Sequence, residues 1–307
     1  TVMGCREFLI AYNINLNTKD HRLAMDIAFE LREAGRSKRT PNPNSKNLLD
    51  GEIVRNEDGS PVKVPGMFKD VKGIGWYVDI YNRAQISINF NNFKVSTIHD
   101  VFDAACLLAS ERGIRVTGSE LVGLIPLEAM LMAGRHYLNK QNRSLGVPTA
   151  DIVECAVQSL GLNDVTEFDP NVKIIDYAVQ SEDRPLMNLV GKEFVEELST
   201  NSPAPGGGSV SALAGALGAA LSSMVAALTH EKKELLDLKP EMDEIGIEAQ
   251  NLKDRLSFLV DEDTNAFNKV MDANRLSATN DEEQTAKNLA IEIANKYAIE
   301  IPMETAK

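Results

Sequence analysis

The sequence predicts an α+β chain in which a ferredoxin-like βαββαβ domain (residues 1–180) is followed by a linker (181–188) and an all-α helical bundle (189–307). Three observations predict this fold class. Strand-like and helix-like apolar patterns alternate as far as Tyr137, the linker is charged and contains proline, and only helical periodicity follows it. A chain of 307 residues is also long enough for two domains that each bury a core.

Six segments of the first domain come in the order strand, helix, strand, strand, helix, strand, which is the split βαβ order. They are residues 8–16, a helix capped by Asn17 or Thr18 and ended by Gly35, residues 76–80, residues 85–90, a helix capped by Thr97 and ended by Gly113, and residues 115–125. Asn82 is expected to form the turn between the two middle strands.

Other parts of the first domain are less regular. Residues 37–71 are polar and contain four prolines, so we expect a functional loop or a mobile insertion there. A helix is predicted over 127–137, with more helix after it, then a loop over 161–170 and an extended segment over 172–179.

A triple glycine precedes the most unusual helix of the second domain. Gly206, Gly207 and Gly208 allow a sharp turn and a close approach to a ligand, so Gly207→Val is expected to crowd the loop and weaken ligand binding. The next helix starts near Ser209, where its free N–H groups favour an anion. One face of this helix carries a stripe of small residues, which predicts a crowded helical core. Another face carries a stripe of large apolar residues. The small stripe is Ser209, Ala212, Ala216, Ala219, Ser223 and Ala226, and the large one is Leu213, Leu217, Leu221, Met224 and Leu228. A buried helix with a flexible leader remains the alternative to a ligand loop.

A second long helical pattern places a carboxylate on an apolar face. That face is formed by Leu252, Leu256, Leu259, Val260, Phe267 and Val270. Asp263 falls in this stripe, whereas Asp261 and Glu262 are expected to point elsewhere. A carboxylate shielded from water can exchange protons near neutrality, so Asp263 is the best catalytic candidate. A helix-capping or ion-paired aspartate is the alternative.

Polar and glycine-rich positions on the predicted strands suggest a second site. Asn13 and Asn15 share one face of their strand, which is unusual for a core, although hydrogen bonds at a strand edge or turn would also explain them. Gly73 and Gly75 would let the backbone beside Ile74 and Trp76 approach a flat ring, whereas Trp76 alone would more commonly anchor a core. Residues 118–120 would line the same cleft or form a bulge.

Five segments, taken in order, resemble the formimidoyltransferase-cyclodeaminase family. They are FLIAYNINL (8–16), GIGWY (73–77), GSELVGLIP (118–126), PGGGS (205–209) and VDEDTNAF (260–267). The first three resemble the second transferase subdomain, and the last two resemble the cyclodeaminase half. The resemblance implies an internal fragment, because the first transferase subdomain and its histidine general base would precede Thr1. None of the four histidines (His21, His99, His136, His230) takes that place. The cyclodeaminase half would continue beyond Lys307. The residues after Pro302 are expected to form the first turn of another helix.

The resemblance implies two reactions of folate-dependent histidine degradation. A formimino group passes between formiminoglutamate and tetrahydrofolate, and formiminotetrahydrofolate then closes to methenyltetrahydrofolate with release of ammonia. Asp263 aligns with the aspartate that the family uses for ring closure. The implied substrate contacts are Asn13, Asn15, Gly73, Ile74, Gly75, Trp76, Gly206, Gly207, Gly208 and Ser209. Tetrahydrofolate, in polyglutamylated form, is the expected co-substrate, and no metal is required.

Composition limits the possible partners. A formal net charge of −13 argues against nucleic acid or an anionic membrane, both of which require a basic face. A polyanionic folate would need a local basic patch, for which Arg32, Arg36, Lys38 and Arg39 are candidates beside the simpler interpretation of a solvated helix end. Three widely spaced cysteines form no metal motif or disulfide framework, which suits the cytoplasm.

Two functions from different classes therefore remain open for this chain. One is a folate-dependent one-carbon enzyme, and the other is a non-catalytic folate-binding and oligomerisation module. The small faces of the glycine-rich helix suggest that a second subunit contributes walls to the site, so we expect a homo-oligomer, a dimer or larger.

Overall fold

The computed structural model describes residues 6–45, 47–179 and 184–307. The chain forms two compact units. The first comprises Thr1–Asn142 and Thr149–Gln180, and the second comprises Arg143–Pro148 and Ser181–Lys307. The predicted linker at 181–188 lies partly outside the described residues. No local sequence pattern indicated that a six-residue segment between two helices of the first unit would belong to the second unit.

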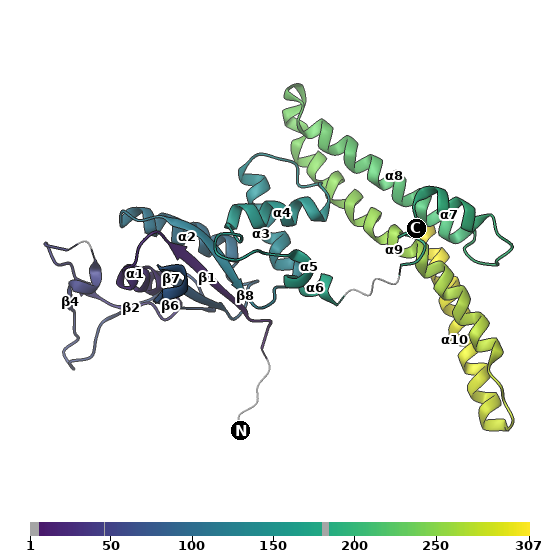
Figure 1. Ribbon diagram of the computed structural model, residues 1–307, viewed down its shortest axis with the longest axis horizontal. Helices are drawn as coiled ribbons and strands as arrows, with labels where there is room; N and C mark the ends of the chain where they lie inside the picture. Colours follow the sequence, from purple (N-terminus) through teal and green to yellow (C-terminus); the bar gives the residue numbers. More distant parts are fainter. Residues whose placement is uncertain (1–5, 46, 180–183) are drawn as a thin grey trace. The chain divides into compact units, whose positions relative to one another are not determined.

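The first unit is built on a sheet of four antiparallel strands (Figure 1). Its strands are β1 (Ile10–Leu16), β6 (Val71–Val78), β7 (Arg83–Phe90) and β8 (Val116–Val122), in the spatial order β6-β7-β1-β8. Helices α1 (His21–Leu31) and α2 (Ile98–Glu111) pack on one face. Tyr12 and Ile14 point into this core and are at most 1% exposed. Alternation along β1 therefore sends Asn13 and Asn15 to the opposite face.

Local signals placed most of these elements correctly. The hydroxyl of Thr97 accepts the Asp100 N–H at the start of α2, and Asn82 adopts a left-handed φ of 53° at the predicted turn. The cap of α1 is Asp20, whose carboxylate accepts the Arg22 N–H at 2.9 Å, and the predicted caps Asn17 and Thr18 were wrong. Asp20 is favoured because it stands immediately before the first helical residue, where its carboxylate reaches a free N–H.

The irregular parts of the first unit contain more structure than the sequence indicated. The stretch 37–71 holds short strands that pair β2 (Arg36–Ser37) with β5 (Lys63–Val64) and β3 (Arg39–Thr40) with β4 (Glu52–Ile53). A single 3₁₀ turn, η1 (Leu48–Asp50), precedes β4, and another, η2 (Asp79–Tyr81), precedes β7.

The chain after β8 is helical. It forms α3 (Leu127–Lys140), α4 (Thr149–Leu160), α5 (Pro170–Lys173) and α6 (Ile175–Ala178). The predicted extended segment at 172–179 is therefore wrong. Asp169 caps α5 and Pro170 occupies its first turn, and both residues favour a helix start over a strand.

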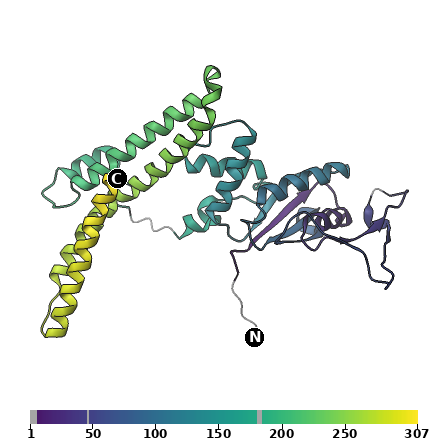
Figure 2. The ribbon, with the colours of Figure 1, turned by 180° about the vertical axis from the view of Figure 1, so that it is seen from behind.

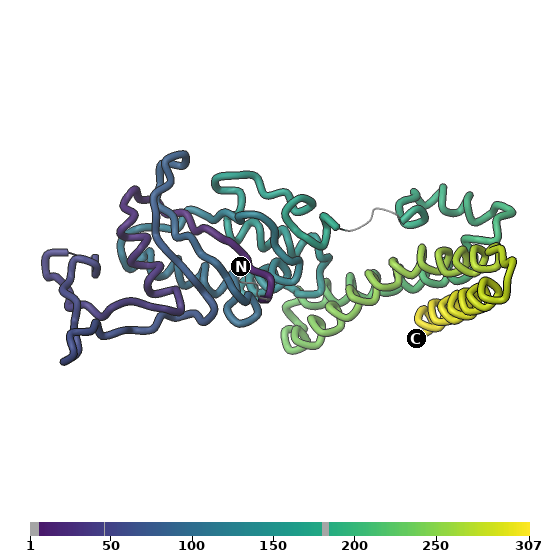
Figure 3. The backbone as a smooth tube through the Cα atoms, turned by 90° about the horizontal axis from the view of Figure 1, so that it is seen from below, coloured from purple at the N-terminus to yellow at the C-terminus, as the bar shows by residue number. Residues whose placement is uncertain are grey.

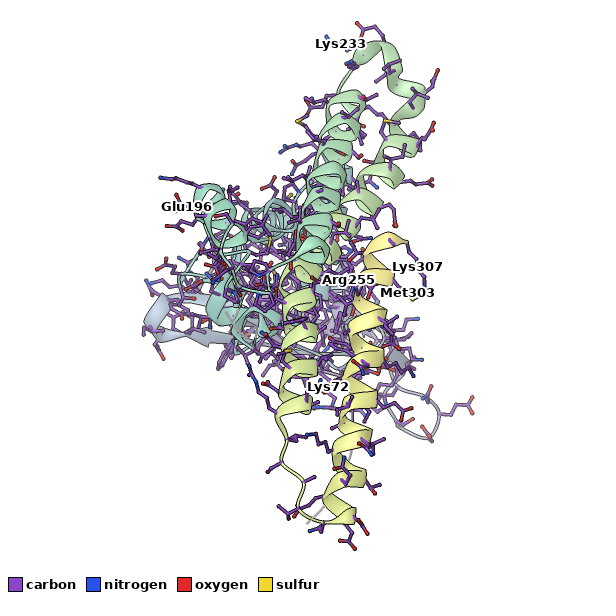
Figure 4. All side chains as sticks on the ribbon, turned by 90° about the vertical axis from the view of Figure 1, so that its right-hand side faces the viewer. Lys72, Glu196, Lys233, Arg255, Met303 and Lys307 are labelled. Atoms are coloured by element: carbon purple, nitrogen blue, oxygen red, sulfur yellow. The ribbon has the colours of Figure 1, made fainter. Side chains whose placement is uncertain are left out.

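The second unit is helical. It contains α7 (Gly191–Leu198), α8 (Gly207–His230), the 3₁₀ segment η3 (Lys233–Leu238), α9 (Lys239–Arg275) and α10 (Asp281–Ala306). Helices α8 and α9 run alongside each other, and α10 returns along the second half of α9 (Figures 2 and 3). Figure 4 shows Arg255 of α9 near Met303 and Lys307 at the end of α10. The Arg255 guanidinium donates a hydrogen bond to Glu304 of α10 at 2.7 Å. Pro302 lies inside α10, so the prediction that a new helix begins after it was wrong.

The two stripes of α8 have opposite environments. Ser209, Ala212, Ala216, Ser223 and Ala226 of the small stripe are buried, as the prediction of a crowded helical core requires. Four residues of the large stripe face outward, since Leu217, Leu221, Met224 and Leu228 are 51–60% exposed, whereas Leu213 packs against the core of the unit. Among the described residues, α8 alone is long and apolar enough to cross a membrane by length and composition. This is weak evidence, because core helices of soluble proteins meet the same criteria.

The segment Arg143–Pro148 docks on α8 and α9. The Leu145 N–H donates to Asp243 at 2.8 Å, and the hydroxyl of Ser223 donates to the Gly146 carbonyl at 3.0 Å. Gly146 and Gly246 touch through their backbones, since a Cβ on Gly146 would lie 2.4 Å from the Gly246 Cα. Only glycine permits this approach.

A carboxylate between α9 and α10 makes the second unit sensitive to acid. Burial tends to raise the pKa of Glu262, but hydrogen bonds from Tyr297, Asn265 and Lys269 outweigh burial and hold it below the ordinary value of 4.5. When a carboxyl group has a lower pKa in the folded state than in the unfolded state, it contributes its full stabilisation of the fold above the unfolded-state pKa. That stabilisation is lost as the pH falls through the folded-state pKa.

We therefore expect Glu262→Gln to lower the free energy of unfolding by about 1.5 kcal/mol at pH 7, because a hydrogen bond to a charged group is lost. The deficit should shrink as the pH falls below the unfolded pKa. Urea unfolding followed by circular dichroism, at pH 7 and at successive values below 4.5, measures it. Glu248→Gln, at an exposed position of the same helix, is the control. A deficit of constant size at every pH would contradict this account.

Candidate active sites

The glycine-rich loop meets Asp263 in the second unit. Gly206 caps α8, so Gly207 and Gly208 form its first residues. Asp263, in the middle of α9, accepts the Ser209 N–H at 3.0 Å and faces its hydroxyl at 3.4 Å. Two segments that lie 54 residues apart in the sequence therefore form one site.

The carboxylate of Asp263 lies against the N-terminal end of a 24-residue helix. The partial positive charge of that helix end and the Ser209 N–H both attract the carboxylate. Ser209 is fully buried and its hydroxyl also lies 3.3 Å from that of Thr264, whereas Asp263 is half-buried. The arrangement holds Asp263 in one orientation while leaving it accessible.

The predicted apolar setting of Asp263 was wrong. The most buried carboxylate of this stretch is Asp261, which is 5% exposed and accepts the N–H groups of Leu186 and Met187 at 2.8 and 3.2 Å. Two residues along a helix differ by about 200° in direction, so Asp261 and Asp263 lie on opposite sides of α9. The side with Asp261 is covered by the chain before α7, and the side with Asp263 is covered by the start of α8. Helix α9 therefore has no single buried face.

The three glycines of the loop differ in their surroundings. A Cβ on Gly208 would lie 2.1 Å from Oδ1 of Asp263, whereas a Cβ on Gly207 would meet no atom within 4 Å. A Cβ at Gly207 therefore crowds no protein atom, whereas Gly208 is the position that lets the loop reach the carboxylate. The expected effect of valine at Gly207 on ligand binding stays a prediction.

We expect Gly208→Ala to displace the Asp263 carboxylate and to lower the free energy of unfolding of the second unit by about 1–3 kcal/mol, as overpacking does. Gly207→Ala is the matched control, and it should be neutral or slightly stabilising, because alanine is the better helix former and the space is open. Thermal unfolding of both variants measures the difference. Equal effects at the two positions would show that the contact with Asp263 is not what restricts Gly208.

A polar network lies on the second face of the sheet in the first unit, where Asn13, Asn15 and Gln85 are buried. The amide of Asn13 donates to Glu120 at 3.2 Å, and the amide of Asn15 donates to Asp164 at 2.9 Å. Gln85 joins the two branches, since its amide donates to Asn15 at 2.6 Å and to Glu120 at 3.3 Å. Because β1 pairs with a strand on each side, the strand-edge explanation for the two asparagines is wrong. Their side chains instead bridge three neighbouring strands.

Three further residues complete this network. Arg83 donates to Asp164 at 2.8 Å, Thr117 donates to the same carboxylate oxygen at 2.8 Å, and Tyr81 donates to Glu120 at 3.0 Å. These residues, with Gln85, were missed by the sequence analysis. Arg83 and Gln85 alternate with apolar residues along β7, so the same period of two that selected the asparagines would have found them.

The glycines of β6 face α1. A Cβ on Gly75 would lie 2.0 Å from the Met25 N, so Gly75 lets α1 lie close to the strand, whereas a Cβ on Gly73 would make only ordinary contact with Ala28 at 3.7 Å. The neighbours of Gly75 face the other way. Trp76 is 44% exposed and Ile74 is 50% exposed, and the register places them across from Gln85 and Ser87 on the face of the polar network. The core-anchor interpretation of Trp76 is therefore wrong. Gly118 packs closely against Asp164, because a Cβ on Gly118 would lie 2.5 Å from the Cβ of Asp164.

The proposed basic patch is mostly occupied within the fold. Arg36 is 7% exposed and pairs with Asp26, and Arg39 donates to the carbonyls of Leu49 and Gly51. Arg32 donates to the Gly35 carbonyl at 3.0 Å. These three guanidinium groups stabilise the segment after α1, so they do not form a free patch for a polyanion.

Comparisons with known proteins agree with the division of the chain into two units. A formiminotransferase domain model matches residues 11–180, and a formiminotransferase-cyclodeaminase model matches residues 191–307. Formimidoyltransferase-cyclodeaminases from Dictyostelium discoideum and Mus musculus are 39% and 36% identical to the chain over its full length. The chain spans about half of each of these relatives (52%).

One solved structure, a formiminotetrahydrofolate cyclodeaminase from Thermotoga maritima, is 34% identical and covers 38% of this chain and 54% of its own. The TM-score of this superposition is 0.33. With one model covering the sheet unit and the other covering the helical unit, the chain belongs to the formiminotransferase-cyclodeaminase family.

Proposed function

We propose that the chain carries parts of two folate sites, one for each unit. In the second unit it closes formiminotetrahydrofolate to methenyltetrahydrofolate with release of ammonia. In the first unit it binds folate and formiminoglutamate for formimino transfer to tetrahydrofolate. The names of the family members support both reactions, and the contact of Asp263 with the loop at Gly208 and Ser209 is the single observation that carries the first.

Ring closure needs an oriented substrate and a proton for the departing amine. Attack of the neighbouring folate nitrogen on the formimino carbon is intramolecular, so orientation supplies much of the rate. In this proposal the loop at Gly206 and Gly207 holds folate beside the N-terminus of α8. Asp263, fixed by Ser209, takes a proton from the attacking nitrogen and delivers one to the ammonia that leaves.

In the first unit, the exposed Trp76 and Ile74 supply an apolar surface suited to a flat pterin. The amides of Asn13 and Asn15 and the carboxylate of Glu120 supply polar groups beside it. The order β1-α1-β6-β7-α2-β8 and the spatial order β6-β7-β1-β8 support a ferredoxin-like topology for this platform, which we propose as its fold.

The test follows the methenyl chromophore after the chain is mixed with formiminotetrahydrofolate in the absence of glutamate, alongside calorimetric titration with tetrahydrofolate. Chromophore growth above the uncatalysed rate would support ring closure by this chain. Binding without chromophore growth would support the alternative of a non-catalytic folate-binding module. If the chain neither binds tetrahydrofolate nor forms the chromophore, both the ring-closure function and the folate-binding alternative would be overturned.

We further propose that the chain forms a homo-oligomer through the outward stripe of α8. Four large apolar side chains at half exposure or more on one helix face are more than a monomer usually leaves to water. The double variant Leu217→Lys with Leu221→Lys should therefore dissociate the oligomer in sedimentation velocity experiments. Leu107→Lys, at a 61%-exposed leucine of the first unit, is the control. A monomeric wild type, or a variant that sediments like it, would refute this interface.

A cytoplasmic location is part of the proposal. The thiols of Cys106 and Cys155 are unpaired, as expected in a reducing compartment.

A further inference from the structure

Two histidines stack between α2 and α3 of the first unit. His99 lies in the first turn of α2, and His136 lies in α3. Their ring centroids are 4.3 Å apart, with an angle of 28° between the ring planes. Asp100 and Asp103 of α2 lie beside them, so two imidazoles and two carboxylates from two helices gather in one place.

The hydrogen bonding of this cluster is unequal. Nε2 of His136 lies 2.9 Å from a carboxylate oxygen of Asp103, whereas Nε2 of His99 is 3.9 Å from Asp100. His99 is only 8% exposed, and its Nδ1 has no hydrogen-bond partner among the residues that the structure describes. A buried ring nitrogen normally finds a partner, so this atom calls for an explanation.

The ligand atoms of His99, Asp100 and His136 all lie within 4.8 Å of one another. We propose that these three side chains bind a divalent metal ion of the zinc class, which bridges the first turn of α2 to α3. Two imidazole nitrogens and one carboxylate oxygen form a usual ligand set for such an ion. Water completes the coordination in this assignment.

Asp103 has the position of a residue that orients a metal ligand. A histidine that binds a metal commonly gives its other ring N–H to a carboxylate, which fixes the ring. The contact between Nε2 of His136 and Asp103 matches this arrangement and leaves Nδ1 of His136 for the metal. Lys140 donates to the same carboxylate at 2.8 Å and Tyr137 donates at 3.2 Å, so Asp103 is itself held in place.

The ligands have room to close around an ion. Metal–ligand bonds of about 2.0–2.2 Å require ligand atoms closer together than 4.8 Å. The side chain of Asp100 is 52% exposed and that of His136 is 27% exposed, so both can rotate toward the buried His99.

The test uses the whole 307-residue chain, freed of metal by a chelator and titrated with Zn²⁺ in a calorimeter. Wild type should bind one ion, and its melting temperature should rise with Zn²⁺ concentration. Affinity should fall roughly 100-fold in His136→Gln and in Asp100→Asn, and about 10-fold in Asp103→Asn, where only orientation is lost. His21→Gln, at an exposed histidine of α1, should bind as wild type does.

Co²⁺ serves as the second probe, because its visible spectrum reports the ligands. Nitrogen and oxygen ligands without a thiolate-to-cobalt absorption in the near-ultraviolet would support the site. That absorption would instead point to Cys106 or Cys155 and would overturn the assignment. Circular dichroism of each variant confirms that it folds. Absence of binding, or equal binding by wild type and folded His136→Gln and Asp100→Asn, would show that the two rings only pack against each other.

Discussion

Replacing Asp263 by asparagine should slow ring closure by about 10²–10⁴-fold, the usual contribution of a general acid–base group. The amide has nearly the shape of the carboxylate, and its oxygen can still accept the Ser209 N–H that Asp263 accepts at 3.0 Å. The loop should therefore keep its position while proton transfer is lost. The rate of chromophore formation from formiminotetrahydrofolate, in the absence of glutamate, measures the effect.

Two comparisons make this result specific to Asp263. Asp272→Asn removes an exposed carboxylate from the same helix and should leave the rate unchanged. In the complete protein, glutamate-dependent transfer should also persist in Asp263→Asn, because the polar network proposed for it is built from the sheet of the other unit. Loss of both activities, or of neither, would contradict the role of Asp263 in ring closure.

Replacing Asp26 by alanine should lower the free energy of unfolding of the first unit by about 3–5 kcal/mol, because it leaves buried cations without their partner. Asp26 is 1% exposed. Its carboxylate lies 2.7 Å from the guanidinium of Arg36 and 2.6 Å from that of Arg112. Glu30 is a second partner of both arginines but is only partly buried, so it offsets little of the loss.

An exposed ion pair of the same unit is the control for this effect. Lys94 and Glu128 lie 3.0 Å apart, and each side chain is more than half exposed. Water screens such a pair, so Glu128→Ala should change the free energy of unfolding by less than about 1 kcal/mol. Chemical unfolding of the two variants provides the comparison. Similar losses in both would mean that the ion pairs of Asp26 contribute no more than a surface pair.

Much of the fold could be predicted from the sequence because the deciding interactions are local. The Thr97 cap and the turn at Asn82 depend on atoms within three residues, so their sequence signals were sufficient. The period of two along β1 also separated Tyr12 and Ile14 from Asn13 and Asn15 correctly. The extended segment predicted at 172–179 failed because the cap at Asp169 was not weighed against the apolar pattern.

Of the candidate sites, the sequence identified the glycine loop and Asp263 through residue types and family resemblance, and it identified the two asparagines through periodicity. It did not reveal the partners of these residues. Gln85 and Asp164 reach Asn15 from positions 70 and 149 residues away, and no local pattern encodes such distances.

The sequence by itself determined the order of the main strands and helices of the first unit, the family, and which residues share a face of a strand or helix. Only the tertiary structure decided what covers each face. In the tertiary structure, α1 packs against Gly75, and Asp261 is the buried carboxylate of α9. Asp263 contacts the glycine-rich loop instead, and the leucines at 217, 221 and 228 of α8 face outward. The reason is that periodicity follows from backbone geometry within a few residues, whereas burial depends on which distant segments pack against a face.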